Sequence, residues 1–386
     1  MNSTPGRTRV VASAAVAFAA LLAAGLAGCS GDAGAASASK GSVDPEVTAQ
    51  LDSYAKPVSE AYSGAPFSAA PAAGKKVLWV TFYSGNPFLA AVGTSFQKAL
   101  QSQGVTVSTC DGKGNPVDVN ACISQGVAQG ADAIQVDGPE TATYANALTA
   151  AAAAKVPVLS GAAVDAGGPL ASGLAAQSSQ PFALTGELAA DWIIADSGAS
   201  AKVLFLTVPD VIGSTQEEKA FSDRMKQKCP QCTVTVEGTT LANWATDLAT
   251  TTNAALLRDP NIGYVVPAFD PMTQFVGPAI QQAGKSASVK TVTVNGSLEQ
   301  MKQVKSGAIA AEVGIDLNAL GYIEADQMLR VLSGVAPVPV AYAPVRVFDA
   351  KNVGSLKLDE ASRAAGLWFA AEGSYADQFS KSVWTK

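Results

Sequence analysis

"KKVLWVTFYSGNPFLAAVGTSFQKALQSQG" (residues 75–104) contains the unit from which the fold can be derived. Its first nine residues form a short apolar run, which is typical of a buried strand. Large apolar residues then recur every four positions from Phe88 to Leu100, so they share one face of a helix. Asn86 precedes this helix as a capping residue, and Pro87 suits its first turn. The stretch therefore predicts a strand followed directly by a helix.

The same alternation of an apolar run and a helical segment continues to about residue 295. Strands that alternate with helices of this length predict βαβ units and a parallel sheet. Two such series meet near residue 178. We therefore predict an α/β fold of two doubly wound, Rossmann-like lobes with parallel sheets. The predicted strands after the first are "VTVSTC", "ADAIQVDG", "VPVLSG", a weaker one near "SGLAAQ", and then "KVLFLTV", "TVTVEG", "GYVVPAF" and "KTVTVNG".

The first 28 residues have the layout of a secretory signal peptide. Arg7 and Arg9 precede an apolar run that ends in "LAGC" at Cys29. This ending resembles the lipobox of bacterial lipoproteins, which implies cleavage after residue 28 and lipidation of Cys29. The alternatives are an uncleaved membrane helix and an ordinary signal peptide with a chance cysteine. Residues 29–74 are rich in Ala, Ser, Gly and Pro and are expected to form a flexible tether that contains one short helix near 45–62.

The composition excludes several classes of function. The net charge is −6 and no block is rich in Lys or Arg, which argues against a nucleic-acid partner. The chain has no histidine, so histidine-based catalysis and histidine metal ligands are excluded. We expect a protein that is not an enzyme and that carries no metal or other cofactor.

Four of the five cysteines form two close pairs, Cys110 with Cys122 and Cys229 with Cys232. An exported protein lies in an oxidising compartment, so we expect both pairs to form disulfides. "CPQC" at 229–232 also has the spacing of a thioredoxin-like redox motif. That motif normally opens a helix after a strand, whereas this one follows a predicted helix and precedes a strand. A structural bridge is therefore the favoured interpretation.

A family resemblance is carried by an ordered set of segments. They are "NPF" (86–88), "GADAIQVDGPETATYANAL" (130–148), "NWATDLATTTNAALLRDPNIGYVVPAFD" (243–270) and "TVTVNGS" (291–297). Over residues 75–345 the chain resembles the type I periplasmic binding proteins, and in particular the ribose-binding branch that serves ABC transporters.

The resemblance implies two lobes joined by three crossings, with the ligand held between them. The N-terminal lobe is expected to comprise 75–178 plus 316–343, and the C-terminal lobe 179–315 plus 344–386. Clefts between domains and the carboxyl ends of parallel strands are also the places where ligands bind in such folds.

The resemblance also supplies candidate ligand contacts. From the first lobe these are Asn86 and Phe88 of the "NPF" turn, with Tyr83 nearby, and from the second lobe Trp244. Two flat rings facing each other can hold a sugar ring or an aromatic ring. Phe88 also fits the apolar stripe of its helix, so a core position is the alternative for this residue.

At other positions the chain departs from the ribose-binding pattern. An Asp-Arg pair is replaced by Ala162 and Ala163, an Arg by Glu217, and a Gln by Ile315. An Asn-Asp pair becomes Phe269 and Asp270, and a later Asp becomes Asn295. We keep Glu217, Phe269, Asp270 and Asn295 as candidate ligand contacts, although Glu217 can equally be an exposed carboxylate at a helix start.

These departures remove charge-assisted hydrogen bonds and add apolar surface. The ligand is therefore expected to be a sugar or sugar-like solute that is less hydroxylated than ribose or partly aromatic. The resemblance implies a monomeric, exported protein, anchored by lipid to the outer face of the cytoplasmic membrane, that delivers this solute to an ABC permease. A sensor that presents its closed form to a membrane receptor and an exported α/β enzyme are the alternatives.

Overall fold

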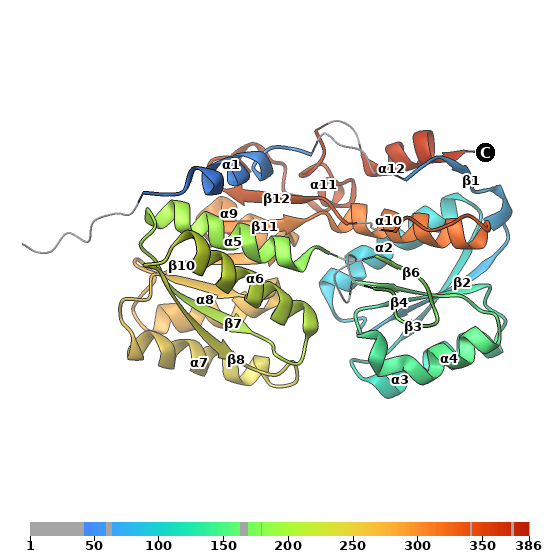
Figure 1. The fold of residues 1–386 in the computed structure, drawn as a ribbon, viewed down its shortest axis with the longest axis horizontal. Helices are drawn as coiled ribbons and strands as arrows, with labels where there is room; N and C mark the ends of the chain where they lie inside the picture. The colour runs from blue at the N-terminus through green and yellow to red at the C-terminus, as the bar shows by residue number, and fades with distance from the viewer. Residues whose placement is uncertain are drawn as a thin grey trace, which may run out of the picture. The chain divides into compact units, whose positions relative to one another are not determined.

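The structure is a computed structural model in which residues 42–58, 64–162, 169–178, 180–339, 342–371 and 374–385 are described. The predicted signal peptide, the lipidation site at Cys29 and the first part of the predicted tether lie outside these residues. Over the described residues the chain forms two α/β lobes (Figure 1), each built on its own sheet.

The N-terminal lobe has a five-stranded, fully parallel sheet in the order β3-β2-β4-β5-β6. Successive residues of β2 face opposite sides of this sheet. Trp79 packs toward α2 and α10, and Val80 packs toward α3 and α4. The strands are β2 Lys76–Thr81, β3 Thr106–Asp111, β4 Ala133–Asp137, β5 Val158–Gly161 and β6 Leu174–Ser178, and the helices are α2 Pro87–Ser102, α3 Pro116–Ala128, α4 Ala145–Ala153 and α10 Leu317–Leu332.

The C-terminal lobe has a six-stranded sheet in the order β12-β11-β10-β9-β7-β8. Five of these strands are parallel, and β12 joins the edge antiparallel to β11. Its strands are β7 Lys202–Thr207, β8 Thr233–Gly238, β9 Tyr264–Pro267, β10 Lys290–Asn295, β11 Ala311–Ile315 and β12 Val345–Asp349. Its helices are α5 Phe182–Ser197, α6 Ile212–Lys228, α7 Trp244–Arg258, α8 Thr273–Gln282 and α9 Leu298–Ser306. The predicted doubly wound α/β architecture is confirmed.

Between β6 and β12, three passages of the chain join the two lobes, as the resemblance implied. They lie between β6 and α5, between β11 and α10, and between α10 and β12. Helix α10 follows a strand of the C-terminal lobe, yet it packs on α2 and β6 of the N-terminal lobe. Asp316 caps α10 at this passage and accepts hydrogen bonds from the backbone N–H groups of Asn318 and Ala319.

The segment predicted as a tether is partly folded onto the lobes. Helix α1 (Pro45–Tyr54) packs on α5 of the C-terminal lobe with Val47 fully buried. Arg224 and Lys228 form ion pairs with Glu46 of this helix. The apolar and acidic side chains of α1 thus meet complementary partners, which the small-residue composition of 29–74 as a whole concealed.

The C-terminal tail also differs from its predicted place. Residues 344–386 were assigned to the C-terminal lobe, but Tyr375, Phe379 and Trp384 are buried in the core of the N-terminal lobe. Trp384 stacks on Tyr322 of α10 with ring centroids 6.0 Å apart. Strand β13 (Trp384–Thr385) pairs in parallel with β1 (Phe67–Ser68), and Figure 1 shows both beside α10. The aromatic residues of the tail find their burial there.

Both expected cysteine pairs are bonded in the structure. Cys110 of β3 and Cys122 of α3 are 1.94 Å apart at their sulfur atoms, and Cys229 and Cys232 are 2.00 Å apart. Cys229 ends α6 and Cys232 precedes β8, so "CPQC" links a helix end to a strand start. This is the structural placement expected from the sequence. Within the described residues, no helix is both long and apolar enough to cross a membrane.

Candidate ligand-binding site

A cavity of about 700 Å³ is lined by residues of both lobes. Most of the lining comes from the segments that follow the strands, which is where open parallel sheets place ligands. From the N-terminal lobe these segments follow β2, β3, β4 and β5, and the passage after β6 adds Gln180 and Phe182. From the C-terminal lobe they follow β7, β8 and β9, and Asn295 at the end of β10 completes the lining. Because the strands of each lobe end at one edge of its sheet, the topology brings these segments together.

Six of the eight sequence-predicted contacts line this cavity. They are Tyr83, Asn86, Phe88, Trp244, Phe269 and Asn295. Asn86 is the N-cap of α2, and its Oδ1 accepts hydrogen bonds from the N–H groups of Phe88 and Leu89. Its amide nitrogen is what remains to offer a ligand. Phe88 is half-buried and packs against the core as well, so both interpretations of this residue describe part of its environment.

The rest of the N-terminal wall comes from the segments after β3 and β4. Lys113, Gly114 and Pro116 line the cavity after β3, and Pro139 and Glu140 line it after β4. The Nζ of Lys113 lies 3.2 Å from a carboxylate oxygen of Asp118. The side chain that could offer a positive charge on this wall is therefore already paired.

The C-terminal wall is largely apolar. The rings of Trp244 and Phe269 meet edge to face with centroids 6.5 Å apart, and Leu241 lies nearby in the lining. Asp210 also lines the cavity, but both of its carboxylate oxygens accept the N–H of Leu241. Its carboxylate thus holds the segment that precedes Trp244.

The polar floor of the cavity contains Asn295 and Gln180. Asn295 accepts a hydrogen bond from the N–H of Asp270 and donates one to Gln180. Its φ of 130° is a backbone conformation that L-residues rarely adopt. These bonds hold its side chain in one orientation at the end of β10.

A hydrogen bond between Glu140 and Ile212 crosses the cavity from one lobe to the other. Glu140 accepts from the N–H of Ile212, the first residue of α6, at 3.2 Å. A carboxylate at this end of a helix is favoured by the positive end of the helix dipole. Gly213 follows, and a Cβ there would lie 2.5 Å from the ring of Phe182. Glycine at 213 therefore allows α6 to lie close to the cavity wall formed by Phe182.

Two predicted contacts, Glu217 and Asp270, do not line the cavity. They are 1% and 2% exposed and lie in the interior of the C-terminal lobe. The carboxylate of Asp270 accepts hydrogen bonds from the hydroxyl groups of Thr293 and Ser297. Glu217 was also considered as an exposed residue at a helix start, but it is buried in the middle of α6. Both predictions placed the residue on the correct element but not on the cavity surface.

These buried carboxyl groups form a cluster with Glu312 of β11. Burial is the main cause that raises the pKa of Asp270 to about 6 and the pKa of Glu217 and Glu312 well above the ordinary glutamate value. Gly296 donates its N–H to Glu312, which fixes the turn after Asn295. The cluster thus supports the floor of the cavity from inside the lobe. Across the described residues, no group of three or more His, Cys, Asp or Glu side chains could hold a metal ion.

Sequence reasoning missed Lys113, Glu140, Gln180, Phe182 and Asp210 as lining residues. Lys113, Glu140 and Asp210 follow predicted strands by two or three residues, so their position was the available signal. Asp111 and Asp137, which end strands β3 and β4, do not line the cavity. Asp137 is fully buried and accepts from Trp79 and Gln135, so it is a core residue rather than a lining one.

The fold and the cavity define a class, that of two-lobed α/β binding proteins with the site between the lobes. Residues 77–336 match the family model of the periplasmic binding protein domain. The match covers most of the chain, and the chain therefore belongs to this family. The expected resemblance to the ribose-binding branch is also supported. The chain is 25% identical over 263 residues to the ribose import binding protein RbsB of Salmonella typhimurium. That alignment covers 66% of this chain and 85% of the relative.

Solved structures of similar fold include two ABC transporter solute-binding proteins. One, from Agrobacterium vitis and bound to α-D-tagatopyranose, has a TM-score of 0.67 and 21% identity, and covers 77% of this chain and all of that one. The other, a 5-methylthioribose transporter solute-binding protein from Thermotoga lettingae in complex with 5-methylthioribose, has a TM-score of 0.67 and 19% identity. It covers 78% of this chain and 94% of that one. At these identities the likeness concerns the fold.

Proposed function

We propose that this protein is a lipid-anchored, extracytoplasmic solute-binding protein. It captures a small sugar-like molecule in the cavity between its lobes and delivers it to an ABC permease. The observation that carries this proposal is the cavity itself, which has room for a small solute and is walled by side chains of both lobes. A ligand that contacts both walls favours the closed arrangement, because it binds that arrangement more tightly than the open one.

The chemistry of the lining supports a solute with fewer hydroxyl groups than ribose, or with an aromatic or thioether part. Phe82, Phe88 and Phe182 line the cavity together with Trp244 and Phe269. The charged side chains of the lining are already engaged: Lys113 with Asp118, Glu140 with Ile212, and Asp210 with Leu241. A free pentose needs many polar partners, and each one left unmade is costly. The uncharged polar side chains of the lining are outnumbered by the apolar ones; they are Tyr83, Asn86, Thr143, Gln180 and Asn295.

Lipid anchoring and permease delivery rest on the sequence and on the family. "LAGC" at 26–29 resembles a lipobox, and the family model is that of periplasmic binding proteins. Two or more acyl chains on Cys29 would hold the protein stably at a membrane surface. Metabolic labelling of the full chain with a radioactive fatty acid tests the anchor. Label on the wild type and none on Cys29→Ser supports it, and equal labelling of both contradicts it.

A thermal-shift screen on residues 30–386 tests ligand capture. The panel contains D-ribose, D-allose, D-tagatose, allitol, 5-methylthioribose, nucleosides and aromatic acids. A compound at 100 times its dissociation constant adds about 2.7 kcal/mol to the free energy of unfolding, which raises the melting temperature by a few degrees. A response to 5-methylthioribose or to a nucleoside without one to D-ribose supports the proposed chemistry. A response to D-ribose alone contradicts the proposed ligand class.

Two matched variants show whether a responding compound occupies the cavity. Ala242→Trp adds a large ring to the cavity lining, and we expect it to abolish the thermal shift. Ala245→Trp makes the same change at an exposed residue of α7 outside the lining and should leave the shift intact. An equal shift in both variants would place the binding site elsewhere. Failure of every compound to shift the wild type would count against capture of solutes of these classes.

A further inference from the structure

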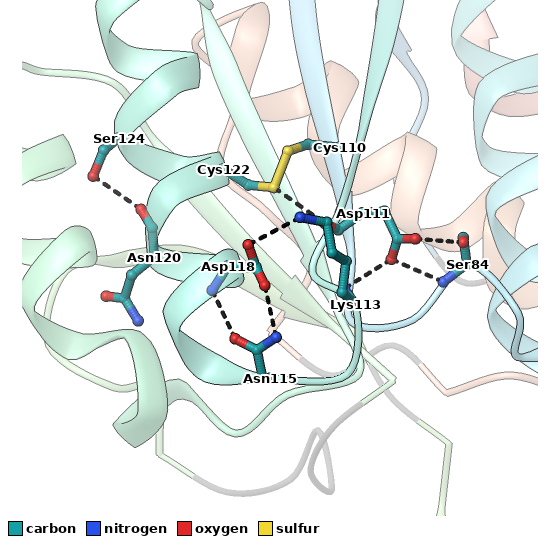
Figure 2. The surroundings of a disulfide bond; sticks show 9 residues. All are labelled: Ser84, Cys110, Asp111, Lys113, Asn115, Asp118, Asn120, Cys122 and Ser124. Carbon is teal, nitrogen blue, oxygen red and sulfur yellow. Dashed lines mark hydrogen bonds and ion pairs between the residues drawn. A yellow bond between two sulfur atoms is a disulfide. The ribbon is translucent and has the colours of Figure 1, made fainter.

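The segment after β3 is held at both ends by bonds within the protein itself. Its base is fixed by the disulfide between Cys110 of β3 and Cys122 of α3 (Figure 2). The bridge therefore spans the cavity-lining residues Lys113, Gly114 and Pro116. Its far end is fixed by Asn115, the N-cap of α3, which accepts from the N–H of Asp118 and donates to the carboxylate of Asp118. The segment is therefore a short, closed loop.

Asp111 lies inside this loop and bonds outward to the segment after β2. Its Oδ1 accepts the N–H of Ser84 at 3.1 Å and the N–H of Lys113 at 2.9 Å, and its Oδ2 accepts the hydroxyl of Ser84 at 2.5 Å. Figure 2 shows these bonds converging on one carboxylate between Ser84 and Lys113. One side chain thus joins two loops that both line the cavity.

Ser84 is the centre of the loop that carries candidate ligand contacts. Tyr83 precedes it and Asn86 follows it by two residues, and both line the cavity. Two backbone hydrogen bonds also join the loops: the N–H of Gly112 donates to the carbonyl of Thr81, and the N–H of Gly114 donates to the carbonyl of Phe82. Gly112 has no room for a side chain, because a Cβ would lie 2.6 Å from Val119. The two loops are therefore packed as one unit.

We propose that Asp111 is a positioning residue of the binding site: it couples the loop after β2 to the loop after β3, and the Cys110–Cys122 disulfide holds it in place. Asp111 itself does not line the cavity. It acts on Tyr83 and Asn86 through Ser84 and on Lys113 through its backbone. The consequence for affinity rests on the proposed function, whereas the coupling between the loops does not.

Amide hydrogen exchange measured by mass spectrometry tests the coupling without any ligand. In residues 30–386 with Asp111→Asn, and separately with both Cys110 and Cys122 changed to Ser, we expect exchange to become at least threefold faster in peptides covering 111–117 and also in those covering 82–88. Faster exchange confined to 111–117 would overturn the proposal, because the second loop would then be independent of the first.

The chain offers a matched control for each variant. Asp132→Asn alters another aspartate of the N-terminal lobe that accepts a backbone N–H, that of Lys76, but at the opposite end of β2. Changing both Cys229 and Cys232 to Ser removes the disulfide of the other lobe. Neither control should alter exchange in 82–88. If either control speeds exchange there as much as its partner variant, a general loss of stability explains the effect and the proposal is wrong.

Titration calorimetry with 5-methylthioribose and with D-ribose tests the consequence for binding. For a compound that binds the wild type, both test variants should weaken binding at least fivefold at a temperature where all variants are folded, and both controls should leave it within twofold. Unchanged binding in both test variants would overturn the positioning role. If neither compound binds the wild type, ligand capture of this kind fails, and the exchange experiment alone decides the coupling.

Discussion

The N-terminal wall of the cavity is held by partly exposed groups, whereas the C-terminal wall rests on buried ones. On the first wall, Asp111 joins two loops, and hydrogen bonds from Ser84 are the main cause that holds the pKa of its carboxyl below the ordinary value. Under the second wall, burial raises the pKa of Asp270, Glu217 and Glu312. The same strand-to-helix topology therefore presents the site on a carboxylate whose pKa is lowered in one lobe and on carboxyl groups whose pKa values are raised by burial in the other.

Removing the disulfide of each lobe should give the largest difference in stability between the two lobes. Cys110 and Cys122 are 12 residues apart, and Cys229 and Cys232 are 3 apart. Because a longer loop loses more entropy on closure, we expect loss of the first bridge to lower the free energy of unfolding by about 3 kcal/mol and loss of the second by about 2 kcal/mol. Urea denaturation of the two double Cys→Ser variants measures both. An equal or larger cost for the second bridge would show that strain or local packing outweighs loop entropy.

Trp244→Ala tests whether the apolar wall supplies binding energy. This ring is a half-buried cavity wall rather than a core side chain, so its loss should reduce affinity more than stability. We expect an affinity loss of about 2 kcal/mol, or roughly 30-fold, for whichever panel compound binds the wild type. Calorimetry measures the loss. Leu257→Ala, at a 72%-exposed residue of the same helix, is the control and should leave affinity unchanged.

Glu217→Gln tests whether the buried carboxyl groups under the C-terminal wall make the stability of the protein depend on pH. The pKa of Glu217 is raised in the folded protein, so its contribution to stability is fully present below the unfolded pKa near 4.5 and is lost as the pH rises through the folded value. Glutamine cannot ionise. We therefore expect the variant to gain stability relative to the wild type as the pH rises from 4.5 to 8, measured by urea denaturation at each pH. A difference that does not vary with pH would show that Glu217 titrates alike in both states.

For Asp111→Asn we expect a pH dependence of stability opposite in sign to that of Glu217→Gln, and the smallest change in the free energy of unfolding. The pKa of Asp111 is lowered on folding, so its contribution is present above the unfolded pKa near 3.8 and is lost as the pH falls through the folded value. Asparagine keeps an acceptor but no charge, so we expect a loss of about 1 kcal/mol at pH 7 that shrinks toward pH 3. The same denaturation series measures it. A loss that grows in acid would contradict the assignment of an anionic anchor to this wall.

Local periodicity was enough to predict most of the fold. The four-residue spacing from Phe88 to Leu100 and the cap at Asn86 correspond to α2 as it stands in the structure. Strands β11 and β12 were not identified individually. The run "AEVGI" of β11 contains Glu312, a charged residue that is fully buried, so its composition did not resemble a core strand. The antiparallel edge strand β12 follows the passage from α10 back to the C-terminal lobe. No local sequence pattern indicates that the chain returns to that sheet.

The site was predictable where it depends on turn chemistry and not where it depends on the direction of a side chain. Asn86 and Trp244 stand in turns after strands, and both line the cavity. Glu217 and Asp270 stand on the expected elements but point inward, and a rotation of one helical position separates a lining residue from a buried one. Tail residues such as Trp384 were assigned to the wrong lobe, because their partners on α10 are about 60 residues away in sequence and no local pattern points to them.

The pairing of β1 with β13 has a consequence for the order in which the lobes fold. The N-terminal lobe contains Phe67 and Trp384 in one core, and Asp326 accepts from both Arg330 and Trp384 there. The sheet of the C-terminal lobe is complete once residue 349 is present. As the chain emerges vectorially, the lobe that comes second in the sequence can therefore finish first, and the first lobe must wait for the last described residues. Contacts of such long sequence separation are slow to form, so we expect the aromatic tail to dock on the N-terminal lobe late in folding.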